Sequence, residues 1–160
     1  MGIVVTERKI KRVPPRLMML YTGEPLYFVT FNTMYHRALL ADERLLSAFR
    51  RYAETGTDRG VAVGRFVLMP DHVHMFVRVS GETRLGVWIK GLKRVLGSIV
   101  RDGIPEGRVW QPGFFDHVLR SSESYLEKWK YVRMNPVRKG LVDKPEDWPY
   151  QGEIVRIDRV

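Results

Sequence analysis

The stretch Met69-Pro70-Asp71-His72-Val73-His74-Met75 decides the fold prediction, because it joins two runs of residues with the alternating pattern of β-strands. The runs Val61 to Met69 and His72 to Val79 are rich in β-branched and aromatic residues, and the Pro-Asp pair between them is typical of a tight turn. The spacing therefore predicts an antiparallel β-hairpin.

Side chains alternate faces along a strand, so the second run has two distinct sides. One side is uniformly apolar and is expected to face the core: Val73, Met75, Val77 and Val79. The other side carries His72, His74, Phe76 and Arg78. Two imidazoles on one face are half of a metal site, since neutral imidazole is the commonest protein metal ligand. The alternative is an exposed face that carries histidines only because they are polar.

A second group of polar side chains lies near the C-terminus. Residues Ser122 to Asn135 predict a helix with a serine N-cap, ended by Pro136. Its buried stripe is expected to be Tyr125, Trp129 and Val132. At about 100° per residue, Tyr131 and Asn135 project together from a different side of the helix. Alternatively, Tyr131 is a boundary aromatic and Asn135 merely ends the helix.

The remaining segments complete a recognisable order of elements. Leu26 to Asn32 is apolar on both faces and predicts a central strand, and Asp42 caps a helix that buries Leu45, Leu46, Phe49 and Ala53. A second helix is expected at Leu85 to Arg101 and a short strand at Phe115 to Leu119. Strand, helix, strand, strand, helix, strand is the ferredoxin-like (RRM-like) α+β arrangement. We expect an antiparallel sheet with helices packed on one face and the active site on the open face.

Composition limits the class of partner. The chain has 160 residues, is 44% hydrophobic and carries a formal net charge of +9, which favours a polyanion such as nucleic acid. No run approaches the roughly 20 apolar residues of a spanning helix, so a membrane is not expected. The absence of cysteine excludes disulfides and thiolate metal sites. The cytoplasm is the expected compartment.

Three ordered motifs carry a resemblance to a known family. They are LMPDHVH at 68–74, WQPGFFDHV at 110–118 and YVRMNPVRKGLV at 131–142. Together they resemble the single-tyrosine HUH transposases of the insertion-sequence 200-like group, and more narrowly the REP-associated tyrosine transposases. The resemblance extends from Leu26 to about Tyr150.

The resemblance implies an activity and a site. His72 and His74 would be the metal-binding pair, Tyr131 would be the nucleophile, and the cofactor would be Mg²⁺ or Mn²⁺. The protein would cleave and rejoin single-stranded DNA beside hairpins through a 5′-phosphotyrosine. One position departs from the pattern: Asn135 stands where mobile relatives often have glutamine or histidine as a further metal ligand. Asn135 is the predicted third ligand, although its side chain is shorter.

The predicted domain organisation is a basic arm at residues 1–24, a catalytic domain at 25–150 and a C-terminal tail at 151–160. The arm contains Arg8, Lys9, Lys11, Arg12 and Arg16. Further predicted nucleic-acid contacts are Arg78, Lys90, Lys93, Arg94 and His117. The alternative for these cations is a solvated face, and for His117 an edge position without a role. Trp148 and Tyr150 are expected to fix the tail to the core.

Two other functions remain open at this point. One is a non-catalytic protein of the same fold that binds hairpin or single-stranded nucleic acid. The other is a zinc hydrolase for small substrates, which leaves the positive charge unexplained. We expect a monomer, with a dimer as the alternative.

Overall fold

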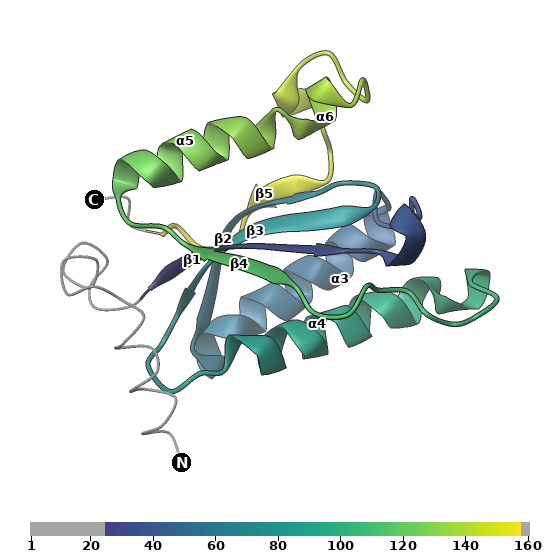
Figure 1. Cartoon of the computed structure of the whole chain (residues 1–160), viewed down its shortest axis with the longest axis horizontal. Helices are drawn as coiled ribbons and strands as arrows, with labels where there is room; N and C mark the ends of the chain where they lie inside the picture. Colours follow the sequence, from purple (N-terminus) through teal and green to yellow (C-terminus); the bar gives the residue numbers. More distant parts are fainter. Residues whose placement is uncertain (1–24, 158–160) are drawn as a thin grey trace.

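The strands form one sheet in the order β4-β1-β3-β2-β5, and every neighbouring pair is antiparallel (Figure 1). The structure, a computed structural model, describes residues 25–157. Its strands are β1 (Leu26–Asn32), β2 (Val61–Leu68), β3 (His72–Val79), β4 (Phe115–Val118) and β5 (Gln151–Glu153). Its α-helices are α3 (Glu43–Glu54), α4 (Leu85–Val100), α5 (Ser122–Arg133) and α6 (Asn135–Arg138). The predicted ferredoxin-like order is confirmed.

The β-hairpin predicted from the sequence is present in the structure. In it β2 and β3 pair from Leu68 opposite Val73 to Val61 opposite Val79, with an irregularity between Val63 and Phe66. The apolar side of β3 is fully buried in the main core, as its alternation predicted. Strand β1 lies between β3 and β4, which explains why it is apolar on both faces.

Helices α3 and α4 cover one face of the sheet (Figure 1). The Asp42 side chain accepts a hydrogen bond from the Arg44 backbone N–H at 2.7 Å and caps α3, as predicted. Helix α3 buries Leu45, Ala48, Phe49 and Ala53, and α4 buries Trp88, Ile89, Leu92, Leu96 and Gly97. Their contact with the sheet places the core on the side away from the two histidines.

Helix α5 packs on the opposite face, so this face is only partly open (Figure 1). The predicted stripe is confirmed: Tyr125 and Val132 are buried, and Trp129 packs beside them. Phe76 of β3 meets the Tyr125 ring edge-on, with ring centres 4.8 Å apart. The face that carries the histidines is therefore sheltered by the helix that carries Tyr131.

Helix α5 ends at Arg133, so the predicted end at Asn135 is wrong. A short helix, α6, begins at Asn135 after Met134, with Pro136 in its first turn. Proline is tolerated there because the first helical N–H groups need no intrahelical acceptor. Pro136 thus lies in the first turn of a separate short helix.

The C-terminal segment joins the sheet. Strand β5 pairs with β2, although residues 151–160 were predicted to be a tail. Trp148 donates its indole N–H to the Leu68 carbonyl at 3.0 Å, which confirms its predicted role in fixing this segment to the core. Ile157 packs over Gly64 so closely that a Cβ at Gly64 would collide with its Cδ1. Within residues 25–157, no helix is both long and apolar enough to cross a membrane.

Candidate active site

The two imidazoles of β3 converge at their outer nitrogens. His72 Nε2 and His74 Nε2 lie 3.1 Å apart. Their inner nitrogens are both occupied: His72 Nδ1 contacts Asp71 Oδ1 at 2.7 Å, and His74 Nδ1 contacts Thr30 Oγ1 at 2.8 Å. These contacts fix both rings, and a carboxylate behind an imidazole is the arrangement that orients histidine ligands in metal sites.

His74 is held in its neutral form. Burial, together with the nearby charges of His72, Lys128 and Arg138, lowers its pKa from 6.5 to about 3. The ring also stacks on Phe28 of β1, with ring centres 5.2 Å apart and planes 24° apart. A neutral, immobilised imidazole keeps a lone pair available at Nε2 near neutral pH.

The histidine pair fits one divalent ion. Nitrogens bonded to a common ion at about 2.0–2.1 Å are roughly 2.8–3.4 Å apart for right-angled to tetrahedral bonds, which includes the observed 3.1 Å. Within residues 25–157, no group of three or more His, Asp or Glu side chains is arranged to hold a metal. Further ligands would have to be amide oxygen, water or phosphate oxygen, the ligands typical of Mg²⁺ and Mn²⁺.

Tyr131 lies on the exposed side of α5. Its side chain is 63% exposed, whereas Tyr125 on the same helix is completely buried. This difference follows from the helical period, which places Tyr125 and Val132 in the buried stripe and Tyr131 outside it. Tyr131 is therefore the tyrosine of α5 that is accessible from solvent.

Arg138 connects Tyr131 with Asn135. The centre of its guanidinium lies 4.0 Å from the centre of the Tyr131 ring, within range of a cation–π interaction. The same group donates from Nη2 to Asn135 Oδ1 at 2.5 Å. Asn135, the predicted third metal ligand, thus has one lone pair of its carbonyl oxygen engaged by Arg138, and the other lone pair remains for a second partner.

Two cations of the site were not assigned from the sequence. Lys128 Nζ lies 5.2 Å from the centre of the Phe28 ring, and both Lys128 and Arg138 influence His74 electrostatically. Lys128 precedes Tyr131 by three residues, a spacing that places both on one side of a helix and that could have revealed it. Arg138 lies beyond the break between α5 and α6, so helical periodicity could not place it over the Tyr131 ring.

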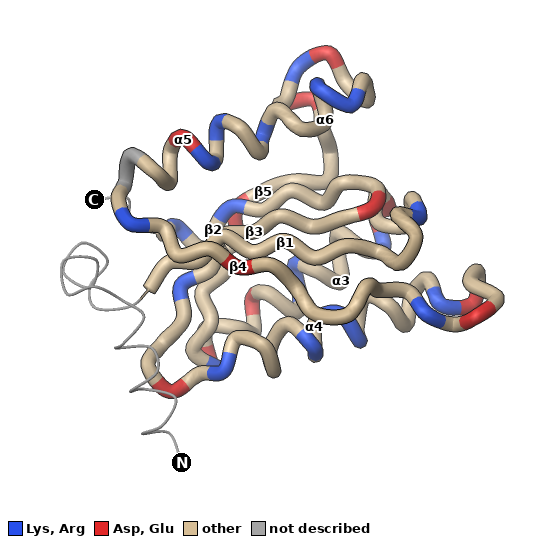
Figure 2. The backbone as a smooth tube through the Cα atoms, viewed as in Figure 1, with Lys and Arg blue, Asp and Glu red and all other residues tan. Residues whose placement is uncertain are grey.

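His117 of β4 is brought to the same region. It pairs with Phe28 in the sheet register, and it lines a hollow of about 270 Å³ that also includes Tyr131 and Lys128. The hollow further includes Leu119, Ser124 and Glu127. The hollow thus lies between β4 and α5. Figure 2 shows that Lys and Arg positions occur along α5 and around α6.

Comparison with known proteins places the chain in a family. Residues 25–135 match the family described as Transposase IS200 like. The chain belongs to this family. The REP-associated tyrosine transposase of Escherichia coli (strain K12) is 24% identical to this transposase over 125 residues, which cover 78% of this chain and 73% of the relative.

Solved structures share its fold. A structure of the REP-associated tyrosine transposase bound to a REP hairpin matches with a TM-score of 0.66 and 24% identity, over 79% of this chain and 75% of that chain. A structure from Deinococcus radiodurans R1 matches with a TM-score of 0.50 and 18% identity, over 70% and 91% of the two chains. The α+β fold predicted for this transposase is therefore confirmed.

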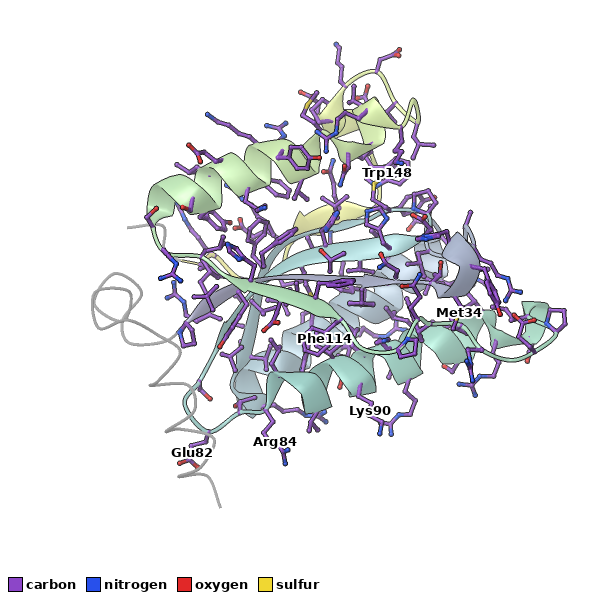
Figure 3. The ribbon with its side chains drawn as sticks, in the orientation of Figure 1. Met34, Glu82, Arg84, Lys90, Phe114 and Trp148 are labelled. Atoms are coloured by element: carbon purple, nitrogen blue, oxygen red, sulfur yellow. The ribbon has the colours of Figure 1, made fainter. Side chains whose placement is uncertain are left out.

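One predicted DNA contact of the transposase has a structural task instead. Lys93 does not point outward: its Nζ donates to the carbonyls of Gln111 at 2.9 Å and Gly113 at 2.8 Å. Burial lowers its pKa accordingly. The sequence could not indicate this, because these acceptors are 18 and 20 residues away. Lys90 and Arg94, its predicted companions, are exposed on α4 (Figure 3).

Arg78 is also not a surface residue of the transposase. Only 9% of Arg78 is exposed, because the sheet face around it is covered. The alternation of residues along β3 had suggested that this face would be open. The predicted contacts Arg8, Lys9, Lys11, Arg12 and Arg16 lie outside the described residues.

Proposed function

We propose that this transposase cleaves and rejoins single-stranded DNA with Tyr131 as the nucleophile. The observation that carries the proposal is the meeting of two elements at one face. The sheet supplies a fixed, convergent pair of imidazoles at His72 and His74, and α5 supplies an exposed phenol in contact with Arg138, whose charge also acts on His74.

In the proposed reaction the Tyr131 oxygen attacks a backbone phosphorus and the bond to the 3′ oxygen breaks. The DNA 5′ phosphate is then linked to the tyrosine, and the 3′ oxygen takes up a proton and leaves as a hydroxyl. Reversal of the same steps with another 3′ hydroxyl joins two strands. Because the phosphodiester energy is kept in the phosphotyrosine, rejoining needs no ATP.

The cations of the site favour this attack. Arg138 contacts the Tyr131 ring, and Arg138 and Lys128 would offset the negative charge that repels a nucleophile from phosphate. His117, in the same hollow as Tyr131, is positioned to receive or return a proton or to contact phosphate. The proposed DNA contacts of His117 and Lys128 are supported by the hollow that they share with Tyr131, and that of Arg138 by its contact with the Tyr131 ring.

His72 and His74 would hold the divalent ion, with Asn135 as the proposed third protein ligand. Mg²⁺ or Mn²⁺ would supply Lewis-acid polarisation of the scissile phosphate. Asp71 and Thr30 keep the two rings oriented for this task. If Asn135 binds the ion, it does so while fixing Arg138 above Tyr131, which would couple the metal site to the nucleophile.

The proposed substrate is DNA with a hairpin beside an unpaired segment. A net charge of +9 supports a polyanion, and a structure of similar fold is described as bound to a REP hairpin. Lys90, Arg94 and the residues of the N-terminal arm are proposed phosphate contacts. We further propose that residues 25–150 form the catalytic domain and contain all of the catalytic side chains. The proposed location is the cytoplasm. The proposed oligomeric state is a monomer, with a dimer as the alternative.

A covalent adduct on a denaturing gel tests the proposal. A labelled hairpin oligonucleotide with an unpaired flank should become attached to the protein in Mn²⁺, and Tyr131→Phe should abolish attachment while its affinity for DNA changes little. Tyr35, whose side chain is 71% exposed, provides the matched control, and Tyr35→Phe should form the adduct normally. Binding without any adduct in the unmodified protein would instead support the non-catalytic binder.

A further inference from the structure

A basic cleft of about 530 Å³ runs along α4, on the side of the sheet away from the histidines. Its floor is apolar and aromatic, formed by Ile89, Val109, Trp110 and Phe114. Its rim is cationic, with Lys90, Arg94, Arg101 and Arg108 exposed. Figure 2 shows these basic positions along α4 and at its C-terminal end. An apolar floor with a cationic rim suits an unpaired nucleotide, which offers a base and a phosphate.

A second, smaller hollow joins this cleft to the active site. It has a volume of about 160 Å³ and is lined by Phe31, Asn32 and residues 111–115. Gly113 and Phe114 line both the hollow and the α4 cleft. At its other end, Asn32 is the register partner of His72. The two hollows, here called the route, therefore adjoin at Gly113 and Phe114, and the smaller one reaches the strand position opposite His72.

Phe115 stands where the route leaves the active-site face. It is 69% exposed, and it pairs with Thr30, which in turn pairs with His74. Two strand spacings place Phe115 about 10 Å from His74 on the same face. A single exposed aromatic has no significance by itself. What distinguishes the Phe115 ring is its position between the histidine pair and the two hollows.

The segment that forms the route is fixed in place. Lys93 holds the carbonyls of Gln111 and Gly113, and Trp110 Nε1 donates to the Lys93 carbonyl at 2.7 Å. The Gln111 N–H donates to the Asn32 carbonyl at 3.0 Å. A preorganised surface loses little entropy when a strand binds to it.

The charge of the route also favours DNA. Glu106, an acid in the connection between α4 and β4, is paired with Arg37, so its carboxylate is neutralised. Figure 3 shows Lys90 on the outer side of α4 and Phe114 between α4 and β4. The exposed carboxylates Asp102 and Asp116 lie in the same part of the chain, whereas the rim of the cleft carries four exposed cations, Lys90, Arg94, Arg101 and Arg108.

We propose that unpaired DNA flanking the cleavage site stacks a base on Phe115 and continues over residues 111–114 into the α4 cleft. The proposal rests on the proposed function, since it assigns a path to the substrate of that site. It gives the exposed cations Lys90 and Arg94 a role in binding the flank, separate from any contact with the hairpin stem.

Binding measured with flanks of different length tests this path. The full chain with Tyr131→Phe, which cannot consume the DNA, would be titrated with a hairpin that carries no flank, or a flank of about 4 or about 12 nucleotides on either side. The longest flank on one side should bind best. Phe115→Leu should reduce this gain about tenfold, and Phe115→Trp should keep it, because the ring is restored.

The paired substitution Lys90→Gln and Arg94→Gln should lower the salt dependence of flank binding by about 1.4 units of slope, as expected for two single-strand phosphate contacts. Arg51→Gln, an equally exposed cation on α3, is the control and should change nothing. Two results would overturn the path. One is equal affinity for short and long flanks on both sides of the hairpin. The other is that the substituted proteins lose as much affinity for a hairpin without a flank as for a flanked one.

The adduct assay keeps the two proposals distinguishable. Adduct formation by the unsubstituted protein without any gain from a long flank would refute the path and leave the proposed function intact. A flank gain that depends on Phe115, without any adduct, would refute cleavage and establish the route as a binding site.

Discussion

The Arg138 guanidinium lies 4.0 Å from the centre of the Tyr131 ring and donates a hydrogen bond to Asn135. The three residues come from two helices that meet at the break after Arg133. Because its guanidinium contacts the ring and is itself held by Asn135, we expect Arg138 to be a positioning residue for the proposed nucleophile.

Replacement of Arg138 should slow adduct formation more than it weakens DNA binding. We expect Arg138→Leu to reduce the rate about tenfold, in line with a cation–π contact of about 0.5–2 kcal/mol, and Arg138→Lys to recover part of it. The measurement is the rate of adduct formation compared with the dissociation constant for the same oligonucleotide. An unchanged adduct rate in Arg138→Leu would leave Arg138 a purely structural role.

Removal of either imidazole should remove metal-dependent cleavage. His72→Ala and His74→Ala should each respond to excess Mn²⁺ better than the double variant, because one remaining imidazole still anchors the ion. The measurement is the rate of cleavage against Mn²⁺ concentration, with EDTA as the zero point. Full activity of the unmodified protein in EDTA would contradict the metal role.

Asn135 can be tested by its oxygen and by its length. If its carbonyl oxygen binds metal, Asn135→Ala should weaken metal affinity about 10- to 100-fold, and Asn135→Asp should retain or strengthen it. Asn135→Gln, the residue often found in mobile relatives, should stay active. If the residue only holds Arg138, Mn²⁺ titration curves of all three variants should overlap that of the unmodified protein while adduct rates fall.

Lys93 and Lys90 were both predicted to contact DNA from the outer side of α4. In the structure Lys93 is hydrogen-bonded to the segment before β4, whereas Lys90 is exposed. Lys93→Met should lower the free energy of unfolding by about 1–3 kcal/mol, because two carbonyls of residues 111 and 113 lose their donor. Lys90→Met, on the exposed side of the same helix, should change it little. Urea denaturation monitored by tryptophan fluorescence measures both, and equal stabilities would restore the outward position predicted for Lys93.

The Asp42 cap should make α3 sensitive to acid. Its hydrogen bond with the Arg44 side chain, together with the backbone contact, holds the pKa of Asp42 below its usual value. A lowered carboxyl pKa contributes stability above its unfolded value near 3.9, and this contribution is lost as the pH falls through the folded value. Asp42→Ala should cost about 1 kcal/mol at pH 7 in urea denaturation. The difference from the unmodified protein should shrink below about pH 4.

Local pattern was sufficient for strands β1 to β4 and for the apolar faces of the regular elements, but it did not reveal β5. The apolar side of β3, the central position of β1 and the buried stripe of α5 all follow from periodicity over a few residues. The exposed side of Tyr131 follows from the same reasoning. These predictions succeed because burial on a regular element repeats at a fixed interval.

Contacts between distant segments were beyond that reasoning. Lys93 reaches carbonyls in the segment before β4, Arg138 folds back over Tyr131 after a helix break, and Arg78 lies under a face that alternation suggested was open. Each depends on where the chain returns in space. A single sequence encodes that return only through the complete packing of the fold.

The position of Ile157 sets a practical limit on how far the chain can be shortened. It lies over Gly64 and packs with Leu26, Phe76 and Tyr125, the wall on which α5 rests. The family match ends at residue 135, and every proposed catalytic side chain lies before residue 150. A polypeptide that ends at residue 150 would contain every proposed catalytic side chain. Its helix α5, which carries Tyr131, would however lose the packing contribution of Ile157. For this transposase the end of the family match is therefore not the end of the packed fold.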